Sequence, residues 1–86
     1  MVSKTVKINN KLGLHARPSA KVVQTATRFK SEITLEKEGL EVNGKSIMGV
    51  MMLAAEMGAD ITVTATGEDE VEAVNTMCEV IASKFD

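Results

Sequence analysis

Residues 61–85 read ITVTATGEDEVEAVNTMCEVIASKF, and this stretch contains the two clearest structural signals in the chain. In its first six positions apolar residues alternate with threonines, which is the period of a strand with one buried face. Apolar residues then recur at intervals of three and four, as along one face of an α-helix. These residues are Val71, Val74, Cys78, Ile81 and Phe85. The stretch therefore predicts a strand followed by a helix that packs on the same core.

The segment between these two signals has the features of a helix start. Its acidic residues, Glu68, Asp69 and Glu70, suit the positive end of a helix dipole. Asp69 and Glu72 have the spacing of a capping box, in which each side chain accepts a hydrogen bond from the other residue's backbone N–H. Cys78 falls on the predicted core face, so we expect a buried structural thiol and not redox chemistry.

The chain before residue 60 divides into shorter elements. Alternation of apolar and polar residues predicts strands around residues 5–9, 32–36 and 40–42. From Ala16 the period becomes helical, with a stripe formed by Pro18, Val22, Ala26 and Phe29. The order is βαββαβα over a single domain of residues 1–86. Strands with one apolar face need helices on that face. We therefore expect an α+β fold with an antiparallel four-stranded sheet covered on one face by three helices.

The middle helix is predicted from residue 47 to about residue 57, because Ser46 is a good N-cap and Gly58 ends the apolar run. Apolar residues go nearly all the way round it. We expect Val50, Leu53 and Ala54 to be buried, and Ile47, Met48 and Met51 to be exposed. The exposed set would then form a surface for several partners, because methionine is flexible and polarizable. The alternative is a helix that is buried on all sides.

Composition excludes several classes of function. The net charge of −2, the lack of a Lys/Arg stripe and the presence of only two aromatic residues argue against nucleic-acid binding. The N-terminus has no signal-like segment and the chain has no long apolar run, so no membrane insertion is expected. The single cysteine fits a reducing cytoplasm. One histidine and one distant cysteine form no metal ligand set, and no catalytic triad is recognisable, so neither a metal, a cofactor nor a hydrolase activity is expected.

The segment Gly13-Leu14-His15-Ala16-Arg17-Pro18-Ser19-Ala20 carries the only histidine of the chain. Pro18 must lie in the first turn of the helix, where its missing N–H is not needed, so His15 is expected at or next to the N-cap. A helix start offers unpaired amides and a partial positive charge to an anion, and Arg17 can pair with phosphoryl oxygens. A neutral imidazole there is suited to accept a phosphoryl group. The alternative is a surface or capping histidine without chemistry.

This segment resembles the active-site motif of HPr, the histidine-containing phosphocarrier family of bacterial sugar uptake. The likeness at residues 13–18 coincides with the element order and with a second matching segment, Lys45-Ser46-Ile47-Met48-Gly49-Val50-Met51. The resemblance spans essentially the whole chain and implies the HPr-like open-faced sandwich. One local departure is Ser19, where many relatives carry alanine.

The resemblance implies a carrier and not an enzyme. By it, His15 takes a phosphoryl group on Nδ1 from enzyme I, which phosphoenolpyruvate charges, and passes it to the IIA domain of a sugar permease. Arg17 would then stabilise the phosphate, at a helix start that includes Ala16 and Pro18. The expected partner surface consists of Ala20, Ile47, Met48 and Met51. A basic rim for acidic partners is expected from Arg17, Lys21, Arg28 and Lys45.

Ser46 is either a helix cap alone or also a regulatory phosphorylation site. The resemblance implies HPr kinase/phosphorylase as the modifying enzyme and a transcription regulator as a further partner.

Two rival interpretations of the protein's function remain open. One is a regulatory, nitrogen-branch relative of HPr, which would differ in the IIA protein that accepts its phosphate. The other is a non-transport binding module that acts as a co-effector, although such relatives lack the histidine. A monomer is expected, because nothing in the sequence suggests an obligate dimer.

Overall fold

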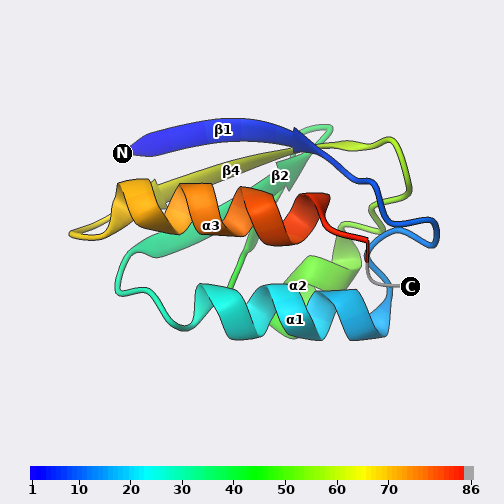
Figure 1. Ribbon diagram of the computed structural model, residues 1–86, viewed down its shortest axis with the longest axis horizontal. Helices are drawn as coiled ribbons and strands as arrows, with labels where there is room; N and C mark the ends of the chain where they lie inside the picture. Colours follow the sequence, from blue (N-terminus) through cyan, green and yellow to red (C-terminus); the bar gives the residue numbers. More distant parts are fainter. Residues whose placement is uncertain (85–86) are drawn as a thin grey trace.

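The computed structural model describes residues 1–84 and has the predicted α+β architecture (Figure 1). Within these residues four antiparallel strands form a sheet in the order β1-β4-β2-β3, and three helices cover one of its faces. Helices α1 and α3 lie side by side, and α2 packs against α1 and β3. The elements are β1 (Val2–Lys7), α1 (Ala16–Ala26), β2 (Glu32–Lys37), β3 (Leu40–Asn43), α2 (Ile47–Met52), β4 (Asp60–Thr66) and α3 (Glu70–Ala82).

Strand β4 forms the centre of the core, as its alternating sequence predicted. Ile61, Val63 and Ala65 are fully buried, whereas the threonines between them are half-buried. Val63 is paired with Lys4 of β1 on one side and with Leu35 of β2 on the other, and Leu35 is also fully buried. Burial of one such aliphatic side chain contributes about 1.5–3 kcal/mol. The sheet thus provides a rigid base for the helices and for the loops at their ends.

The buried face of α3 differs from the prediction at its edge. Its buried residues are Ala73, Val74, Met77 and Ile81. Val71 is 59% exposed and Cys78 is only partly buried, because both lie about a quarter of a turn from the centre of this stripe. Desolvation of the Cys78 thiol raises its pKa, which keeps the thiol uncharged. Phe85, the last residue of the predicted stripe, lies outside the described residues.

Helix α2 is shorter than predicted, because it ends at Met52 and not near residue 57. Ala54 adopts a φ of 48°, a left-handed conformation through which a right-handed helix cannot continue. The Nζ atom of Lys37, at the end of β2, donates to the carbonyls of Leu53 at 3.4 Å and Ala54 at 3.3 Å. A side chain from β2 therefore binds the carbonyls of the C-cap residue and of the residue after it.

The early end of α2 also changes which residues are buried. Val50 and Leu53 are buried, as predicted. Ala54 is exposed, which contradicts the prediction, and Ala55 is buried in its place. The chain has left the helix before these two alanines, so helical spacing no longer decides which of them faces the core.

We expect Ala54→Gly to raise the free energy of unfolding by about 0.5–1 kcal/mol. The left-handed conformation costs a residue with a Cβ about 1–2 kcal/mol, and the greater chain entropy of glycine in the unfolded state offsets part of the relief. Urea denaturation measures the change. Ala55→Gly is the matched control, because Ala55 is buried and has no positive φ, and it should destabilise. An Ala54→Gly protein no more stable than the parent would contradict the prediction.

The start of α3 is not held by the predicted capping box of Asp69 and Glu72. Asp69 is the N-cap residue, but its side chain makes no capping hydrogen bond to the helix. Glu70 reaches back instead, and its carboxylate accepts a hydrogen bond from the Gly67 N–H at 3.1 Å. The carboxylate of Asp69 is directed to another part of the chain.

Asp69 binds the loop between α1 and β2, and this contact predicts a dependence of stability on pH. Its carboxylate accepts hydrogen bonds from the Ser31 hydroxyl at 2.5 Å and from the amides of Ser31 at 3.0 Å and Lys30 at 2.9 Å. These bonds, the Ser31 hydroxyl first, lower the pKa of Asp69 from 3.8 to about 2. Because the pKa is lower in the folded state, the stabilisation is complete above about pH 5 and is lost as the pH falls toward about 2.

Asp69→Asn should remove this part of the pH dependence while leaving the rest unchanged. The measurement is a set of urea midpoints between about pH 6 and pH 2 for both proteins. The parent should lose more stability than the variant across this window. Curves that run parallel for the two proteins would show that Asp69 does not act in this way.

Candidate functional site

His15 lies at the open start of α1, as the sequence predicted. It is the N-cap residue, with extended backbone angles (φ −79°, ψ −165°), and its carbonyl accepts the first helical hydrogen bond from the Ser19 N–H at 2.9 Å. The residue is exposed, and its imidazole makes no hydrogen bond to any other part of residues 1–84. Both ring nitrogens are therefore accessible from solvent.

The backbone next to His15 presents donors without partners. The N–H groups of Ala16 and Arg17 bind no acceptor within residues 1–84, and Pro18 has no N–H. Ala16 and Arg17 are exposed and Pro18 is buried. The guanidinium of Arg17 also makes no ion pair in the described part of the chain. The two free amides at the helix start can bind an anion beside His15, and the Arg17 guanidinium is not engaged by another described residue.

The segment before His15 is fixed by hydrogen bonds to the chain that follows α2. The Leu14 N–H donates to the Ala55 carbonyl at 2.8 Å, and the Leu14 side chain is buried. Asn10 closes the loop, because its Nδ2 donates to the Gly13 carbonyl at 2.8 Å and its carbonyl accepts from the Gly13 N–H at 2.9 Å. Two segments far apart in the sequence thus meet at His15.

An exposed apolar surface lies next to His15. Ile47, Met48 and Met51 of α2 are 43%, 72% and 46% exposed, so the alternative of a helix buried on all sides is wrong. Met51 lines the same shallow hollow as His15. Ala20 is half-buried and lies in a neighbouring hollow with Arg17.

Leu12 belongs to this surface and was not predicted. It is 73% exposed and lines the hollow that contains His15 and Met51. The available signal was a leucine between Lys11 and Gly13, in a polar loop to which the sequence assigned no helix or strand. Such a residue has no place in a periodic core, which is the reason to look for it at the surface.

Ser46 caps α2 as predicted, but Lys45 does not belong to a free basic rim. The Ser46 Oγ accepts a hydrogen bond from the Gly49 N–H at 3.1 Å. The Lys45 Nζ donates to the Phe29 carbonyl at 2.7 Å, which ties α2 to the chain that leaves α1. The other three residues of the predicted rim, Arg17, Lys21 and Arg28, are exposed.

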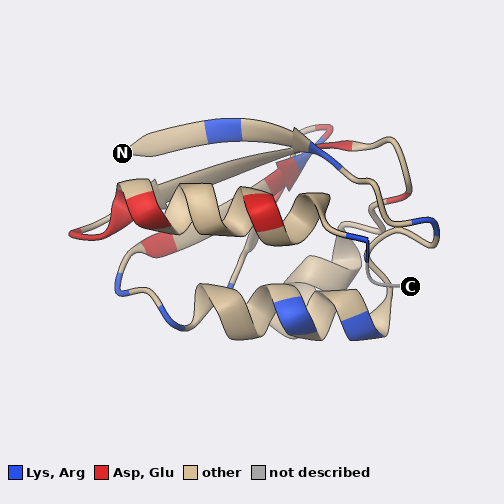
Figure 2. Ribbon diagram, in the orientation of Figure 1, with Lys and Arg blue, Asp and Glu red and all other residues tan. Residues whose placement is uncertain are grey.

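Charge separates the two long helices (Figure 2). Helix α1 contains Arg17 and Lys21 and no acidic residue, whereas α3 contains Glu70, Glu72 and Glu79 and no basic residue. The helix that begins next to His15, α1, therefore carries a net positive charge. This arrangement favours an acidic partner over α1.

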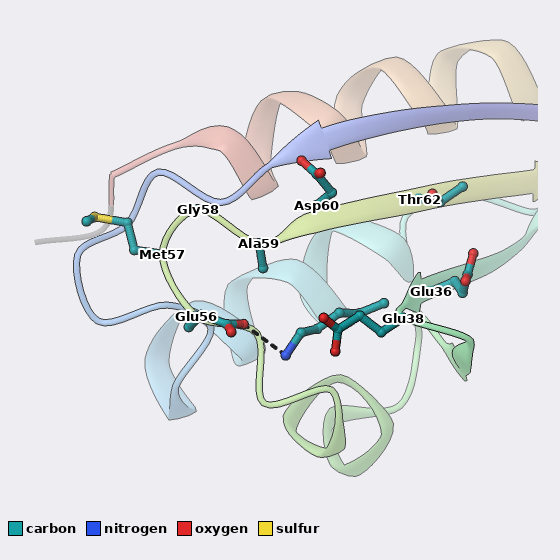
Figure 3. A pocket seen from close by; sticks show the side chains of 9 residues that line it. Glu36, Glu38, Glu56, Met57, Gly58, Ala59, Asp60 and Thr62 are labelled. Carbon is teal, nitrogen blue, oxygen red and sulfur yellow. Dashed lines mark ion pairs between the residues drawn. The ribbon is translucent and has the colours of Figure 1, made fainter.

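A second hollow lies between the end of β2 and the start of β4 (Figure 3). Its acidic lining includes Glu36, Glu38 and Asp60, and the Lys37 Nζ forms an ion pair with Glu56 at 2.8 Å. The hydrogen bond from Lys37 keeps the pKa of Glu56 below its usual value. Among residues 1–84 no three His, Cys, Asp or Glu side chains are placed to hold a metal ion. The ion pair fixes the loop after α2.

Comparison with known proteins assigns the chain to a family. The family described as "PTS HPr component phosphorylation site" matches residues 2–83. The chain is 49% identical over 85 residues to phosphocarrier protein HPr of Xylella fastidiosa, covering 99% of this chain and 96% of that one. It is 48% identical over 81 residues to HPr-like protein Crh of Bacillus subtilis, covering 94% and 95% of the two chains.

The fold gives the same assignment. A crystal structure of HPr from Thermoanaerobacter tengcongensis superposes with a TM-score of 0.90 at 47% identity, covering 94% of this chain and 91% of that one. The molecule is thus a phosphocarrier of the phosphotransferase system and not an enzyme. The chain belongs to the HPr family. Within residues 1–84, every helix is too short or too polar to cross a membrane.

Proposed function

We propose that His15 accepts a phosphoryl group on Nδ1 from phospho-enzyme I and transfers it to the IIA domains of sugar permeases. The observation that carries this proposal is the unbonded, exposed imidazole of His15 beside the free amides of Ala16 and Arg17. In the transfer, a P–N bond forms at Nδ1 while the bond between phosphorus and the donor breaks. The site needs only to position the group and stabilise its charge.

In this proposal Arg17 and the helix start hold the phosphoryl oxygens. The guanidinium is free to form charge-assisted hydrogen bonds, which are stronger than neutral ones. Ala16 contributes its amide. Pro18 sets the backbone direction of the first turn and removes no donor that the helix needs.

The proposed partner surface consists of Ala20, Ile47, Met48 and Met51, with Leu12 added from the structure. It lies next to His15 and combines exposed methionines with the basic residues of α1. Enzyme I and the IIA domains must bind it in turn, which requires small interfaces with rapid release. The carrier would act as a monomer in the cytoplasm, and light scattering at working concentration tests the monomer.

Ser46 is proposed as a regulatory phosphorylation site for HPr kinase/phosphorylase, and the modified form is proposed to bind a transcription regulator. Its side chain is half-buried at the cap of α2, next in sequence to exposed Ile47 and Met48. A phosphate there would place negative charge beside the partner surface and oppose an acidic partner.

Ser46→Asp is expected to slow phosphorylation by enzyme I by about tenfold while leaving the fold intact. The carboxylate still suits an N-cap position, so the cap survives while the surface gains a negative charge. Initial rates of transfer from enzyme I and a urea denaturation curve provide the measurement. Ser46→Asn, a neutral cap of similar size, is the matched control and should transfer normally. Equal rates for the Asp and Asn variants would remove the regulatory proposal.

The carrier function is tested with labelled phosphoenolpyruvate and a catalytic amount of enzyme I. The expected product carries label that is acid-labile and alkali-stable, as a phosphohistidine is. Absence of label, with an enzyme I that is active on another HPr, would reject the carrier function. The methionine surface and its partners would then be the next objects of study.

A regulatory role is the second candidate, and the similarity to HPr-like protein Crh favours it. It covers two forms, a nitrogen-branch relative and a co-effector that works by binding alone. The identity of the IIA protein that accepts phosphate from His15 distinguishes a transport carrier from a nitrogen-branch relative. A cellular role that survives His15→Ala would identify a co-effector that works by binding alone.

A further inference from the structure

The Leu14 carbonyl lies just before the N-cap of α1, outside the helix, and accepts no backbone N–H within residues 1–84. The Ser19 Oγ donates a hydrogen bond to this carbonyl at 3.0 Å. Ser19 is fully buried, so water does not compete for this bond.

The bond acts on the peptide unit that leads directly into His15. The Leu14 carbonyl and the His15 N–H belong to the same planar unit, so fixing one fixes the plane of both. The Leu14 N–H is held on the other side by the Ala55 carbonyl at 2.8 Å. Both backbone polar groups of Leu14 are thus anchored, one to the helix and one to the loop after α2.

We propose that Ser19 is a positioning residue for phosphoryl transfer at His15, an inference that rests on the proposed carrier function. Its hydroxyl sets the orientation of the Leu14–His15 peptide and, through it, the direction in which the imidazole leaves the backbone. Ser19 does not touch the phosphoryl group, because it is fully buried beneath the exposed residues of the first turn. Ser19 would affect the transfer rate through the orientation of the His15 imidazole, because a reaction that depends on the positioning of its reacting groups is slowed by small changes in their orientation.

The chain offers a matched control for this bond in Thr25. Thr25 is also buried in α1, and its Oγ1 donates to the Lys21 carbonyl at 2.9 Å. That carbonyl already faces the Thr25 N–H within the helix, so the hydroxyl is a second donor and not the only one. Thr25→Val and Ser19→Ala each remove one buried hydroxyl from the same helix, but only the second frees a carbonyl next to His15.

The experiment compares Ser19→Ala and Thr25→Val with the parent as substrates of enzyme I. Ser19→Ala should lower kcat for phosphorylation about tenfold with KM unchanged, and should shift the His15 amide and imidazole resonances in NMR spectra. Thr25→Val should change neither kcat nor the His15 resonances. Ser19→Cys, which keeps a weak donor of similar size, should restore part of the rate.

Ser19→Ala with parental kcat, or with unmoved His15 resonances, would overturn the inference. So would an equal loss of kcat in Thr25→Val, because the effect would then follow from the loss of any buried hydroxyl. A failure of the carrier function itself is recognised separately, since the parent would then take no label from enzyme I at all.

Discussion

His15→Ala is expected to abolish phosphorylation by enzyme I and to leave the stability of the protein nearly unchanged. The chain contains no other histidine that could accept the group. The imidazole is exposed and makes no hydrogen bond or ion pair within the described chain, so its removal breaks no polar interaction of the fold. Surface substitutions of this kind change the free energy of unfolding by about 0.5 kcal/mol or less. The backbone of residue 15 can continue to act as the N-cap.

The measurement combines transfer of label from phosphoenolpyruvate with a urea denaturation curve for the same preparation. Val71→Ala is a suitable control, because Val71 is 59% exposed on α3, away from the apolar surface beside His15. The control should be labelled at the parental rate. Acid-labile label that persists in His15→Ala would contradict the assignment of this residue, and a large loss of stability would contradict the exposed position of its ring.

Gly13→Ala is expected to cost about 3 kcal/mol and to slow phosphoryl transfer as well. Gly13 has a φ of +67°, and a Cβ added to it would lie 2.1 Å from the Ala55 carbonyl oxygen and 2.9 Å from the Cα of Glu56. The strained conformation and the overlap with backbone each cost about 1–3 kcal/mol. The loop before His15 can escape only by moving away from Ala55, which would break the bond to the Leu14 N–H.

Gly39→Ala separates the effect of backbone conformation from that of close contact. Gly39 also has a positive φ, of +86°, but nothing lies within 4 Å of the position of its Cβ. It should cost only about 1–2 kcal/mol and leave transfer unchanged. Urea denaturation and the rate of charging by enzyme I test both variants. Equal losses in the two proteins would show that the contact between the two loops is not what holds the site.

The parts of the structure that depend on neighbours in sequence could be predicted from the sequence. The alternation of apolar and polar residues around Val63 predicted the central strand, and Pro18 predicted the start of α1 with His15 at its N-cap. Ser46 gave the start of α2 in the same way. Each of these signals acts over a few residues, where periodicity and backbone chemistry are sufficient.

Three of the errors have a common physical cause, which is competition from residues distant in sequence. The end of α2 depends on Lys37, whose Nζ binds the carbonyls after the helix. The capping box failed because Ser31, 38 residues away, takes the carboxylate of Asp69. The Lys45 Nζ donates a hydrogen bond to the Phe29 carbonyl and so does not contribute to the basic rim. No local pattern in the sequence reports these partners.

The pairing of β1 with β4 constrains the order in which the molecule can be assembled during synthesis. Val2 lies opposite Ala65, so the first strand has no partner until most of the chain has left the ribosome. The β2–β3 hairpin, by contrast, joins residues close in sequence, such as Lys37 and Leu40. Because contacts of long sequence separation form late and slowly, the nascent chain holds an unpaired β1 and an unsupported His15 loop until β4 emerges. A ribosome-bound chain that stops before residue 60 should therefore be unable to accept phosphate.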